Sequence, residues 1–418
     1  MFKQKKSLFL IASALVLAAC GGGGGDKETI RLQVWGPEKE GEKEVYNYLA
    51  AEFQKLHTDI TFKITYGDVG EGDAATQALA DVDTAADIFM FADDQLSNLV
   101  EKGVLNALST TYANKVKTRD LDASVQAATY KKGTDEEKLF AFPLAADNGY
   151  FLYYNSAFFT DAEVDSLETM LAKTDATHQF VMDMGNGYYS VAPIMNVGEI
   201  SYDPVAKVHT TDYNGTKSVD AMQGFMNLVQ PKLDKGFKND NPDNVLADFG
   251  DTEGNKVVAA VTGVWNADNI EGYLGTKYAA SKLPTFKSAD DSTVQMGAFA
   301  GSKLVGVKSS TAQPAWALAF ADFITDEAAQ TYRFAEIGKG PSNIVVSGST
   351  AVQANEALAA LGAQAEFAIP QSKSVGSAFW DASAAVGNFV VNGPASEDAP
   401  QTIKAQLDAF VAAITLAS

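Results

Sequence analysis

Cysteine and histidine are scarce in this sequence. The 418 residues include one cysteine, Cys20, and three histidines, His57, His178 and His209, which stand far apart. A single cysteine excludes a disulfide within the chain, and the histidines lack the spacing of metal ligands. Walker, His-Glu-x-x-His and Gly-x-Ser-x-Gly motifs are also missing. The sequence therefore predicts a protein that is not an enzyme and that carries no cofactor or metal.

Positive charge is in short supply. Lys and Arg total 32 against 53 Asp and Glu, which gives a formal net charge of -21 at pH 7. Such a surface repels phosphate backbones and acidic lipid headgroups, so nucleic-acid binding and polybasic membrane binding are excluded. A neutral ligand remains compatible with this charge.

Long apolar runs are missing except near the N-terminus. Residues 1–6 carry three lysines, and residues 8–19 form an apolar run that is too short to span a bilayer about 30 Å thick. Residues 17–20 (Leu-Ala-Ala-Cys) look like a lipobox, in which the cysteine sulfur takes a diacylglycerol. We therefore predict a lipoprotein signal peptide over residues 1–19, lipidation of Cys20, and attachment to the extracytoplasmic face of the cell membrane.

Five consecutive glycines, at residues 21–25, follow the predicted lipidation site. A stretch without side chains has nothing to bury and behaves as a flexible coil. Residues 20–28 are predicted to be a tether that keeps a folded body near the membrane while leaving it free to rotate.

The rest of the chain has a globular composition, with 46% hydrophobic residues. Its length favours more than one domain. Short β-like runs alternate with longer helical ones, which indicates α/β architecture with crossover connections. Strands are expected at residues 30–35, 60–66, 87–91, 140–144, 149–154 and 257–264, and helices at 40–57, 74–86, 316–324 and 377–392. Because no long linker stands out, the domains are expected to share crossing strands.

Two weak motifs are better explained as structure than as sites. Residues 70–75 resemble a dinucleotide loop by letters, but Gly67 and Asp68 interrupt the strand before it. Residues 239–243 have oxygen-bearing side chains at alternate positions, yet they lack the turn glycine and the closing acid of a calcium loop. Neither motif changes the prediction that the chain holds no cofactor.

Several segments, taken in order along the chain, resemble the maltose-binding protein family, the extracellular solute-binding proteins of ABC importers. They are residues 87–95, 103–105, 139–147 with 152–155, 263–266, 283–287 and 377–380. The resemblance spans roughly residues 30–415. It implies an α/β, two-lobed periplasmic-binding-protein-like fold (type II, maltose-binding-protein-like) with an interlobe ligand cleft and a hinge.

The family's layout implies a division of this chain. The first lobe is expected at residues 29–145 plus 300–350, and the second at 146–299 plus 351–418. The expected function is capture of maltose or a maltodextrin by hinge closure and delivery to an ABC permease, by a protein that is itself a monomer.

The resemblance also assigns ligand-binding roles to individual residues. The expected ring contacts are Phe91, Tyr189, Trp265 and Trp380, the expected hydroxyl contacts are Asp94, Gln95 and Asp147, and Glu38 and Lys39 lie in a loop where the family uses charged groups. Aromatic faces suit the C-H face of a pyranose, and carboxylates and amides suit its hydroxyls.

Each aromatic residue also has a structural interpretation. Phe91 is as compatible with the core as with a site, whereas Trp265 ends a strand beside polar residues, where α/β proteins present ligands. Trp380 stands about 100° around its helix from Phe379, which belongs to the apolar stripe, so Trp380 is expected to face the ligand. The two remaining tryptophans, Trp35 and Trp316, are predicted to be core residues.

The loop at residues 184–189 has two glycines and two tyrosines and suits a sugar-facing turn. Gly187 stands where the family's best-known maltose receptor has an acid, which leaves room for longer maltodextrins. Three alternatives remain open at this point: a receptor for another oligosaccharide or an ion, a surface-anchored glycosidase with two cleft carboxylates, and an adhesin.

Overall fold

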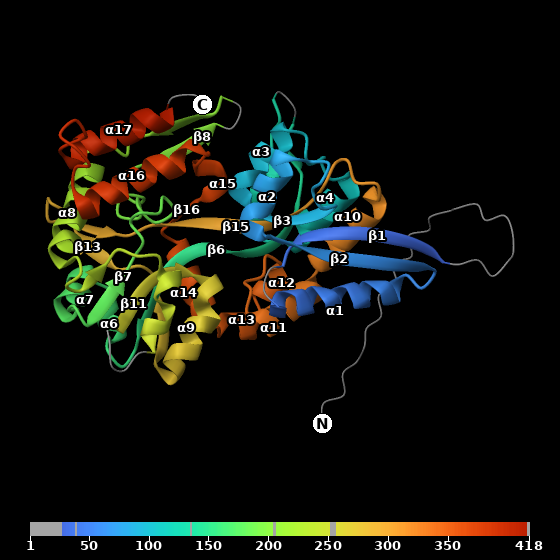
Figure 1. Cartoon of the computed structure of the whole chain (residues 1–418), viewed down its shortest axis with the longest axis horizontal. Coiled ribbons are helices and arrows are strands. Elements are labelled where there is room, and N and C mark those ends of the chain that lie inside the picture. Colours follow the sequence, from blue (N-terminus) through green and yellow to red (C-terminus); the bar gives the residue numbers. More distant parts are fainter. Residues whose placement is uncertain (1–26, 38–39, 134–135, 204–205, 251–255, 416–418) are drawn as a thin grey trace, which may run out of the picture.

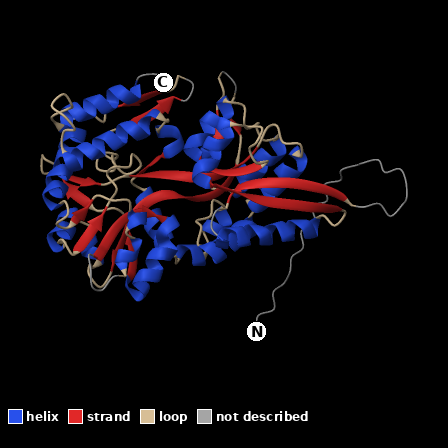
Figure 2. Ribbon diagram, viewed as in Figure 1, coloured by secondary structure: helices blue, strands red, loops and turns tan. Residues whose placement is uncertain are grey.

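The computed structural model describes residues 27–37, 40–133, 136–203, 206–250 and 256–415. Cys20, Glu38 and Lys39 lie outside the described residues. Two lobes lie side by side along the long axis, and one sheet runs through both (Figure 1). Its path is β10-β7-β11-β6-β15-β3-β1-β2, with β12 and β16 paired to β6 and β15. Helices cover both faces of the strands (Figure 2), as expected for an α/β protein.

The first lobe is built on three parallel strands. They are β1 (Glu28–Gly36), β2 (Ile60–Gly70) and β3 (Ile88–Ala92), with β1 in the centre. Its other elements are α1 (Glu40–Leu56), α2 (Glu71–Ala80), the 3-10 helix η1 (Asp93–Gln95), α3 (Leu96–Glu101), α4 (Thr110–Arg119), α5 (Asp122–Ala127), β4 (Thr129–Tyr130), β5 (Lys138–Leu139), α10 (Pro314–Ile324), α11 (Glu327–Ile337) and α12 (Ile344–Ser347). Helix α13 (Thr350–Gln353) links α12 to α14 (Glu356–Ala365) of the second lobe.

The second lobe takes its strands mainly from the middle of the chain. It contains α6 (Asp161–Val164), α7 (Leu167–Lys173), β7 (His178–Val181), β8 (Ile200–Asp203), β9 (Val208–Thr211), α8 (Thr216–Val229), β10 (Phe237–Lys238), β11 (Lys256–Gly263), η5 (Val264–Asn266), α9 (Ala267–Leu274), β12 (Tyr278–Ser281), β13 (Thr285–Lys287), β14 (Thr293–Gln295), α14 (Glu356–Ala365), α16 (Ala378–Asn392) and α17 (Ile403–Thr415). Short 3-10 turns connect several of these elements.

Two long strands belong to both lobes. One end of β6 (Phe142–Asn155) pairs with β11 of the second lobe, and its other end pairs with β15 (Ala298–Val307). Strand β15 in turn pairs with β3 of the first lobe. The chain crosses again near β16 (Ala368–Pro370) and α15 (Gln371–Ser374), which lies between the lobes (Figure 1). The expectation of shared crossing strands is confirmed.

The sequence predicted two strands where the structure has one. Residues 145–148 were expected to separate strands at 140–144 and 149–154, but β6 runs through them with irregular pairing to β15. Two polar side chains interrupt the apolar pattern without interrupting the strand, because partners hold them: Asp147 accepts a hydrogen bond from the Gly340 amide, and Asn148 donates one to Gln371. The helix expected at residues 74–86 is also displaced, since α2 covers Glu71–Ala80.

The helix ends of the first lobe follow local rules. Pro314 lies in the first turn of α10, where its missing N-H costs nothing, and the Asp326 side chain caps α11 by accepting from the Ala329 amide at 2.8 Å. Gly338 ends α11 in the left-handed conformation, with a φ of 63°. This turn leads the chain toward Gly340 and the strand β6.

Separate apolar cores fill the two lobes. One joins residues of β1, β3, α1 and α10 in the first lobe, and another joins β6, β7, α8, α16 and α17 in the second. A smaller core lies under α9 and α14 on the opposite face of the second lobe's sheet. None of the helices that the structure describes has the length and apolarity needed to cross a bilayer.

Candidate functional site

The parallel strands of the first lobe end at a common edge, where α/β proteins usually bind ligands. Strand β2 leads directly into Glu71 at the start of α2, and β3 leads directly into η1 with Asp93, Asp94 and Gln95. Glu71 is paired with Lys303 of the crossing strand β15, at 2.5 Å. Polar and charged groups therefore gather at this edge, next to the crossing strands.

Of the two carboxyl residues of η1, Asp93 is buried and Asp94 is half-buried. Asp93 is 2% exposed, and burial together with the neighbouring Asp94 raises its pKa well above the usual value. Burial also raises the pKa of Asp94 to about 6, although Gln95 donates a hydrogen bond to its Oδ2 at 2.9 Å. Such carboxyls are strong hydrogen-bonding groups for a polar ligand, since water reaches them poorly.

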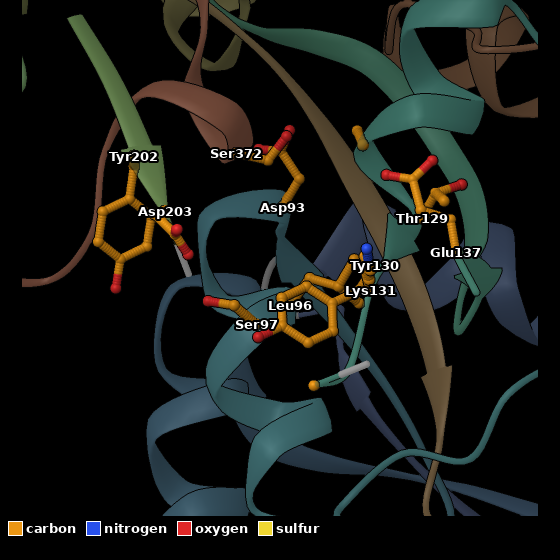
Figure 3. Close-up of a pocket in the computed structure, with 12 residues that line it drawn as sticks. Asp93, Leu96, Ser97, Thr129, Tyr130, Lys131, Glu137, Tyr202, Asp203 and Ser372 are labelled. Carbon is orange, nitrogen blue, oxygen red and sulfur yellow. The ribbon is translucent and has the colours of Figure 1, made fainter. Parts of the chain in front are cut away.

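Asp93 has one free oxygen atom. Its Oδ1 is buried and has no hydrogen-bond partner among the described residues, while the Ser302 backbone and the Ser372 side chain of α15 lie close enough to favour the charged carboxylate. Asp93 also lines a 420 Å³ cavity bounded by residues of both lobes, including Tyr130 and Tyr202, with Ser372 beside it (Figure 3). The Asp93 side chain therefore lies between the lobes, and its Oδ1 is buried there.

Asp147, in strand β6, is a second carboxyl of the same kind. Its Oδ2 accepts from the Gly340 amide at 2.8 Å, and its Oδ1 has no partner in the described part of the chain. Asp147 is 2% exposed and lies close enough to Lys303 to help raise the pKa of that lysine.

The second lobe contributes aromatic side chains to the same region. The ring of Tyr188 lies 6.3 Å from Trp265 and 6.2 Å from Trp380, and it stacks on Phe299 at 5.6 Å with an interplanar angle of 22°. Tyr188, Trp265 and Trp380 are all partly exposed, whereas Phe299 is buried in the floor of this group. Three partly exposed rings from three separate segments thus form one aromatic surface.

Glycines allow the close packing behind these rings. A Cβ atom on Gly263 would come within 2.1 Å of the Trp265 indole, which lies back over the end of β11. A Cβ atom on Gly187 would come within 2.1 Å of the Trp380 carbonyl oxygen, because the loop at residues 184–189 runs against the start of α16. A side chain at Gly187, such as an acid, has no room in this arrangement.

The crossing strand β15 brings the polar and aromatic groups together. Tyr188 stacks on Phe299, and two residues further along the strand an added Cβ atom on Gly301 would lie 3.0 Å from the Asp93 Oδ1. Alternate residues of a strand point to the same face and lie about 7 Å apart. Tyr188 of the second lobe and Asp93 of the first therefore lie side by side on one face of β15, and the electrostatic influence of Asp93 and Asp94 on Tyr188 agrees with this.

The predicted ligand-binding residues fall into two groups in the structure, one near the crossing strands and one in the core. Trp265, Trp380, Asp94, Gln95 and Asp147 lie around the crossing strands, as described above. In contrast, Phe91 is 0% exposed and belongs to the first core, which is the structural interpretation that its sequence position left open.

The two tyrosines of the loop at residues 184–189 also lie in different surroundings. Tyr189 is 6% exposed and its ring contacts Tyr150 at 4.9 Å, so it packs into the second core. Tyr188, the other tyrosine of this loop, holds the position beside Trp265 and Trp380 that the sequence assigned to Tyr189. The predicted alternation around α16 is confirmed, because Phe379 is fully buried whereas Trp380 is partly exposed.

Sequence reasoning missed several groups of the site. No local sequence pattern indicated Glu71 or Lys303 as site residues, because their pairing joins segments that are far apart in the chain. Tyr188 and Asp93 could have been suspected only as neighbours of residues already chosen, Tyr189 and Asp94. No group of His, Cys, Asp and Glu in the described part of the chain has the arrangement of a metal site.

This arrangement suits a ligand with apolar ring faces and polar edges. Aromatic rings bury large areas against apolar faces, and carboxyl, amide and hydroxyl groups bind polar edges with selectivity, because an unpaired buried polar group costs about 1 to 3 kcal/mol. A pyranose has both features.

Comparisons with known proteins agree with this architecture. A family model described as bacterial extracellular solute-binding protein matches residues 48–360. No curated protein sequence matches the chain. The solved structure of the maltodextrin-binding protein MalE1 from L. casei BL23, without ligand, is 27% identical, with 93% of this chain and 99% of that one covered and a TM-score of 0.75.

Other solved structures share the two-lobed fold. One that contains acarbose is 26% identical over 93% of this chain and 99% of the other, with a TM-score of 0.79. The maltose-maltodextrin-binding protein of Alicyclobacillus acidocaldarius is 18% identical over 92% of this chain and all of its own, with a TM-score of 0.71. The fold is thus that of the maltose-binding proteins, and the chain belongs to the bacterial extracellular solute-binding protein family.

Proposed function

We propose that this protein is the substrate-binding lipoprotein of an ABC importer and that it captures maltose or a maltodextrin between its lobes. The observation that carries the proposal is the aromatic surface of Tyr188, Trp265 and Trp380 beside the carboxyls of Asp93 and Asp94. Solute-binding relatives with known maltodextrin or acarbose ligands support it.

Capture is proposed to occur by hinge closure. The aromatic rings belong to the second lobe and Asp94 to the first, so a ligand that touches both favours the closed arrangement of the lobes. Bending at the crossing strands β6 and β15 would open the cleft. The lobes are proposed to divide at residues 29–145 plus 300–350 and 146–299 plus 351–418.

Binding is tested by calorimetric titration of the mature domain with maltose, maltotriose and maltotetraose, with cellotriose as a comparison. Saturable binding of a maltodextrin, and weaker binding of cellotriose, is expected. If no member of the maltodextrin series binds but cellotriose does, the protein is a receptor for another oligosaccharide.

A surface-anchored glycosidase is the alternative from another functional class. Such an enzyme needs two carboxyls about 5 to 10 Å apart on either side of the scissile bond. Asp93 and Asp94 are adjacent in η1, so this pair does not lie on two sides of a bond. Prolonged incubation with maltotetraose followed by chromatography is expected to return the ligand intact, and release of shorter sugars would establish turnover.

After capture, the loaded protein is proposed to dock as a monomer on a membrane permease. The lipid on Cys20 and the tether at residues 20–28 would keep it close to that permease on the extracytoplasmic side. The extracellular location of the family agrees with this placement.

A further inference from the structure

His209 is a buried histidine whose two ring nitrogens both have partners. It lies in β9 and is 2% exposed, and its Nδ1 is 2.8 Å from the Ile414 carbonyl oxygen in the last turn of α17. Its Nε2 accepts a hydrogen bond from the Gly376 amide at 2.9 Å. Because a backbone amide can only donate, Nε2 carries no proton, and the neutral ring holds its one proton on Nδ1, which donates to Ile414.

Gly376 belongs to the segment that joins α15 to α16. Helix α15 lies against η1 of the first lobe and against β8 of the second, and α16 begins two residues after Gly376. The Gly376 carbonyl accepts from the Phe379 amide, in the first turn of α16, at 3.0 Å. An added Cβ atom on Gly376 would come within 2.4 Å of the Tyr202 ring, so this segment lies directly on the hairpin of β8 and β9. The hydrogen bond to His209 therefore holds the start of the helix that carries Trp380.

A proton on Nε2 would affect one of the two contacts of the ring. It would turn Nε2 into a donor that faces the Gly376 N-H, and the hydrogen bond between them would be lost. Nδ1 would keep its contact with the Ile414 carbonyl, because the partial negative charge at the C-terminus of α17 favours a cation there. The ring would thus stay on α17 while the segment at Gly376 is released.

We propose that His209 is a positioning residue for the aromatic surface, and that a proton on its Nε2 releases Gly376 and weakens sugar binding. The inference rests on the proposed function and adds a control by pH to it. Release of Gly376 frees the first turn of α16, so that Trp380 spends part of its time away from its place beside Tyr188. A ligand that needs both rings in place then has a lower apparent affinity, because only part of the protein is competent to bind it.

The surroundings of His209 place the change in the acid range. Burial lowers the pKa of His209 from its usual value of 6.5, and the hydrogen bond to Ile414 opposes this effect. The phenol of Tyr202, whose ring centre is 4.7 Å away, stays neutral in this range because burial raises its pKa. The unfolded chain takes up the proton before the folded protein does, so His209 destabilises the fold as the pH falls below about 6.5. The packed elements also carry charged residues that are not among the causes of the lower pKa: Asp203, Lys207, Asp212, Asp381, Lys404 and Asp408.

NMR spectroscopy tests the state of the ring directly, because the chain has only three histidines. At pH 7.5 the nitrogen shifts of His209, identified by their absence from His209→Gln, are expected to show a bare Nε2 and a protonated Nδ1. As the pH falls, the His209 ring and the Gly376 amide should shift together, with a midpoint below 6.5. A proton on Nε2 at pH 7.5, or a ring that stays neutral down to pH 4.5, would overturn the inference whether or not a sugar binds.

Calorimetric titration with maltotriose at pH 7.5 and pH 4.5 tests the link to binding. Glutamine in His209→Gln is uncharged at both pH values, and its Oε1 can accept from the Gly376 amide. The wild type is expected to lose about 3- to 10-fold more affinity than this variant between the two pH values. Asp94, whose pKa is about 6, titrates in the same range but is present in both proteins. A histidine with a purely structural role would change stability on substitution and leave the pH dependence of binding unchanged.

His178→Gln is the matched control. The Nδ1 of His178 contacts the carboxyl of Asp175, three residues away, at 3.1 Å, so this ring holds its own turn and not the start of α16. The variant is expected to bind maltotriose with the affinity and pH dependence of the wild type. Equal pH dependence of the wild type and His209→Gln would overturn the inference while leaving the proposed function intact. Failure of the wild-type protein to bind any maltodextrin at pH 7.5 would overturn the proposed function and the link to binding with it.

Discussion

Trp380 is the residue at which helical periodicity and tertiary structure agree most directly. Its neighbour Phe379 is fully buried, while the Trp380 indole is partly exposed and reaches Tyr188. It also touches the core, since its ring lies 5.4 Å from Phe299 and 5.3 Å from Phe379. Truncation should therefore affect mainly the ligand and only secondarily the fold.

Trp380→Ala is expected to weaken maltodextrin binding by about 2 to 4 kcal/mol, which is roughly 30-fold to 1000-fold. Its unfolding free energy should fall by less than the 3 to 5 kcal/mol or so that a core tryptophan loses. Titration and urea unfolding of the same variant give both quantities. Trp316→Ala serves as the comparison, because Trp316 packs on His57 and Phe62 in the first lobe and should lose stability alone. A Trp380 variant that unfolds easily but binds normally would place this indole in the core.

Asp94 illustrates a cost that the binding site imposes on the fold. Burial raises its pKa to about 6 from 3.8, so at neutral pH the carboxylate is less stable in the folded protein than in the unfolded chain. The folded state binds the proton more tightly, and Asp94 therefore destabilises the protein increasingly as the pH rises through about 6.

Asp94→Asn is expected to raise the unfolding free energy at pH 7 by about 1 to 3 kcal/mol and to weaken sugar binding. The stability difference should shrink as the pH falls through 6 and nearly vanish near pH 4. Urea unfolding of both proteins at pH 7.5 and pH 4.5 checks this. Distant titrating groups such as His209 cancel in the difference, whereas Asp93, whose pKa Asp94 raises, adds to the gain. An equal gain at both pH values would mean that the ionisation of Asp94 is not its cause.

Among the structural elements, the contact between the loop at residues 184–189 and helix α16 positions the aromatic surface. The two backbones approach closely at Gly187, which faces the Trp380 carbonyl, and at Gly387, where an added Cβ atom would come within 1.7 Å of the Met184 carbonyl oxygen. The Ser383 hydroxyl donates to the Gly187 carbonyl at 2.8 Å. These contacts fix Tyr188 and Trp380 relative to each other.

Gly187→Ala should separate the two elements, since its Cβ atom would overlap the Trp380 carbonyl oxygen. A loss of about 1 to 3 kcal/mol in unfolding free energy is expected, together with weaker maltotriose binding. Gly272→Ala in α9 is the control: nothing lies within 4 Å of its added Cβ atom, and alanine favours the helix by about 1 kcal/mol. Unchanged affinity of Gly187→Ala would show that the spacing of these elements does not control the site.

At the scale of the whole molecule, the proposed anchor is expected to be independent of the folded body. Described structure begins at residue 27, and β1 begins at Glu28, just after the five glycines. Among the described residues, the apolar cores that stabilise the body begin with Ile30 in β1. Attachment to the membrane should therefore be separable from folding.

Cys20→Ala is expected to release the protein from the membrane fraction without changing its thermal midpoint or its affinity for maltotriose. Fractionation of cells that express wild type and variant, followed by unfolding and titration of the released protein, checks both parts. Continued membrane association of the Cys20→Ala variant would contradict lipid anchoring through this residue.

The sequence by itself determined the features that depend on local periodicity and on strand ends. Alternation and apolar runs predicted β1, β2, β3 and β11 within a few residues, and helical spacing predicted which of Phe379 and Trp380 faces outward. These predictions succeed because backbone periodicity and burial are coupled within a single element. The resemblance then supplied the two-lobed fold, which the comparisons confirm.

Only the tertiary structure decided which groups meet between the lobes. Tyr188 and Tyr189 are adjacent in the loop, and the packing against Trp380 and Phe299 determines that Tyr188 faces the cleft. The pairing of Glu71 with Lys303, and the approach of Asp93 to Gly301, join segments more than 200 residues apart. Local sequence patterns do not predict such contacts, because the contacts depend on how the crossing strands bring the two lobes together.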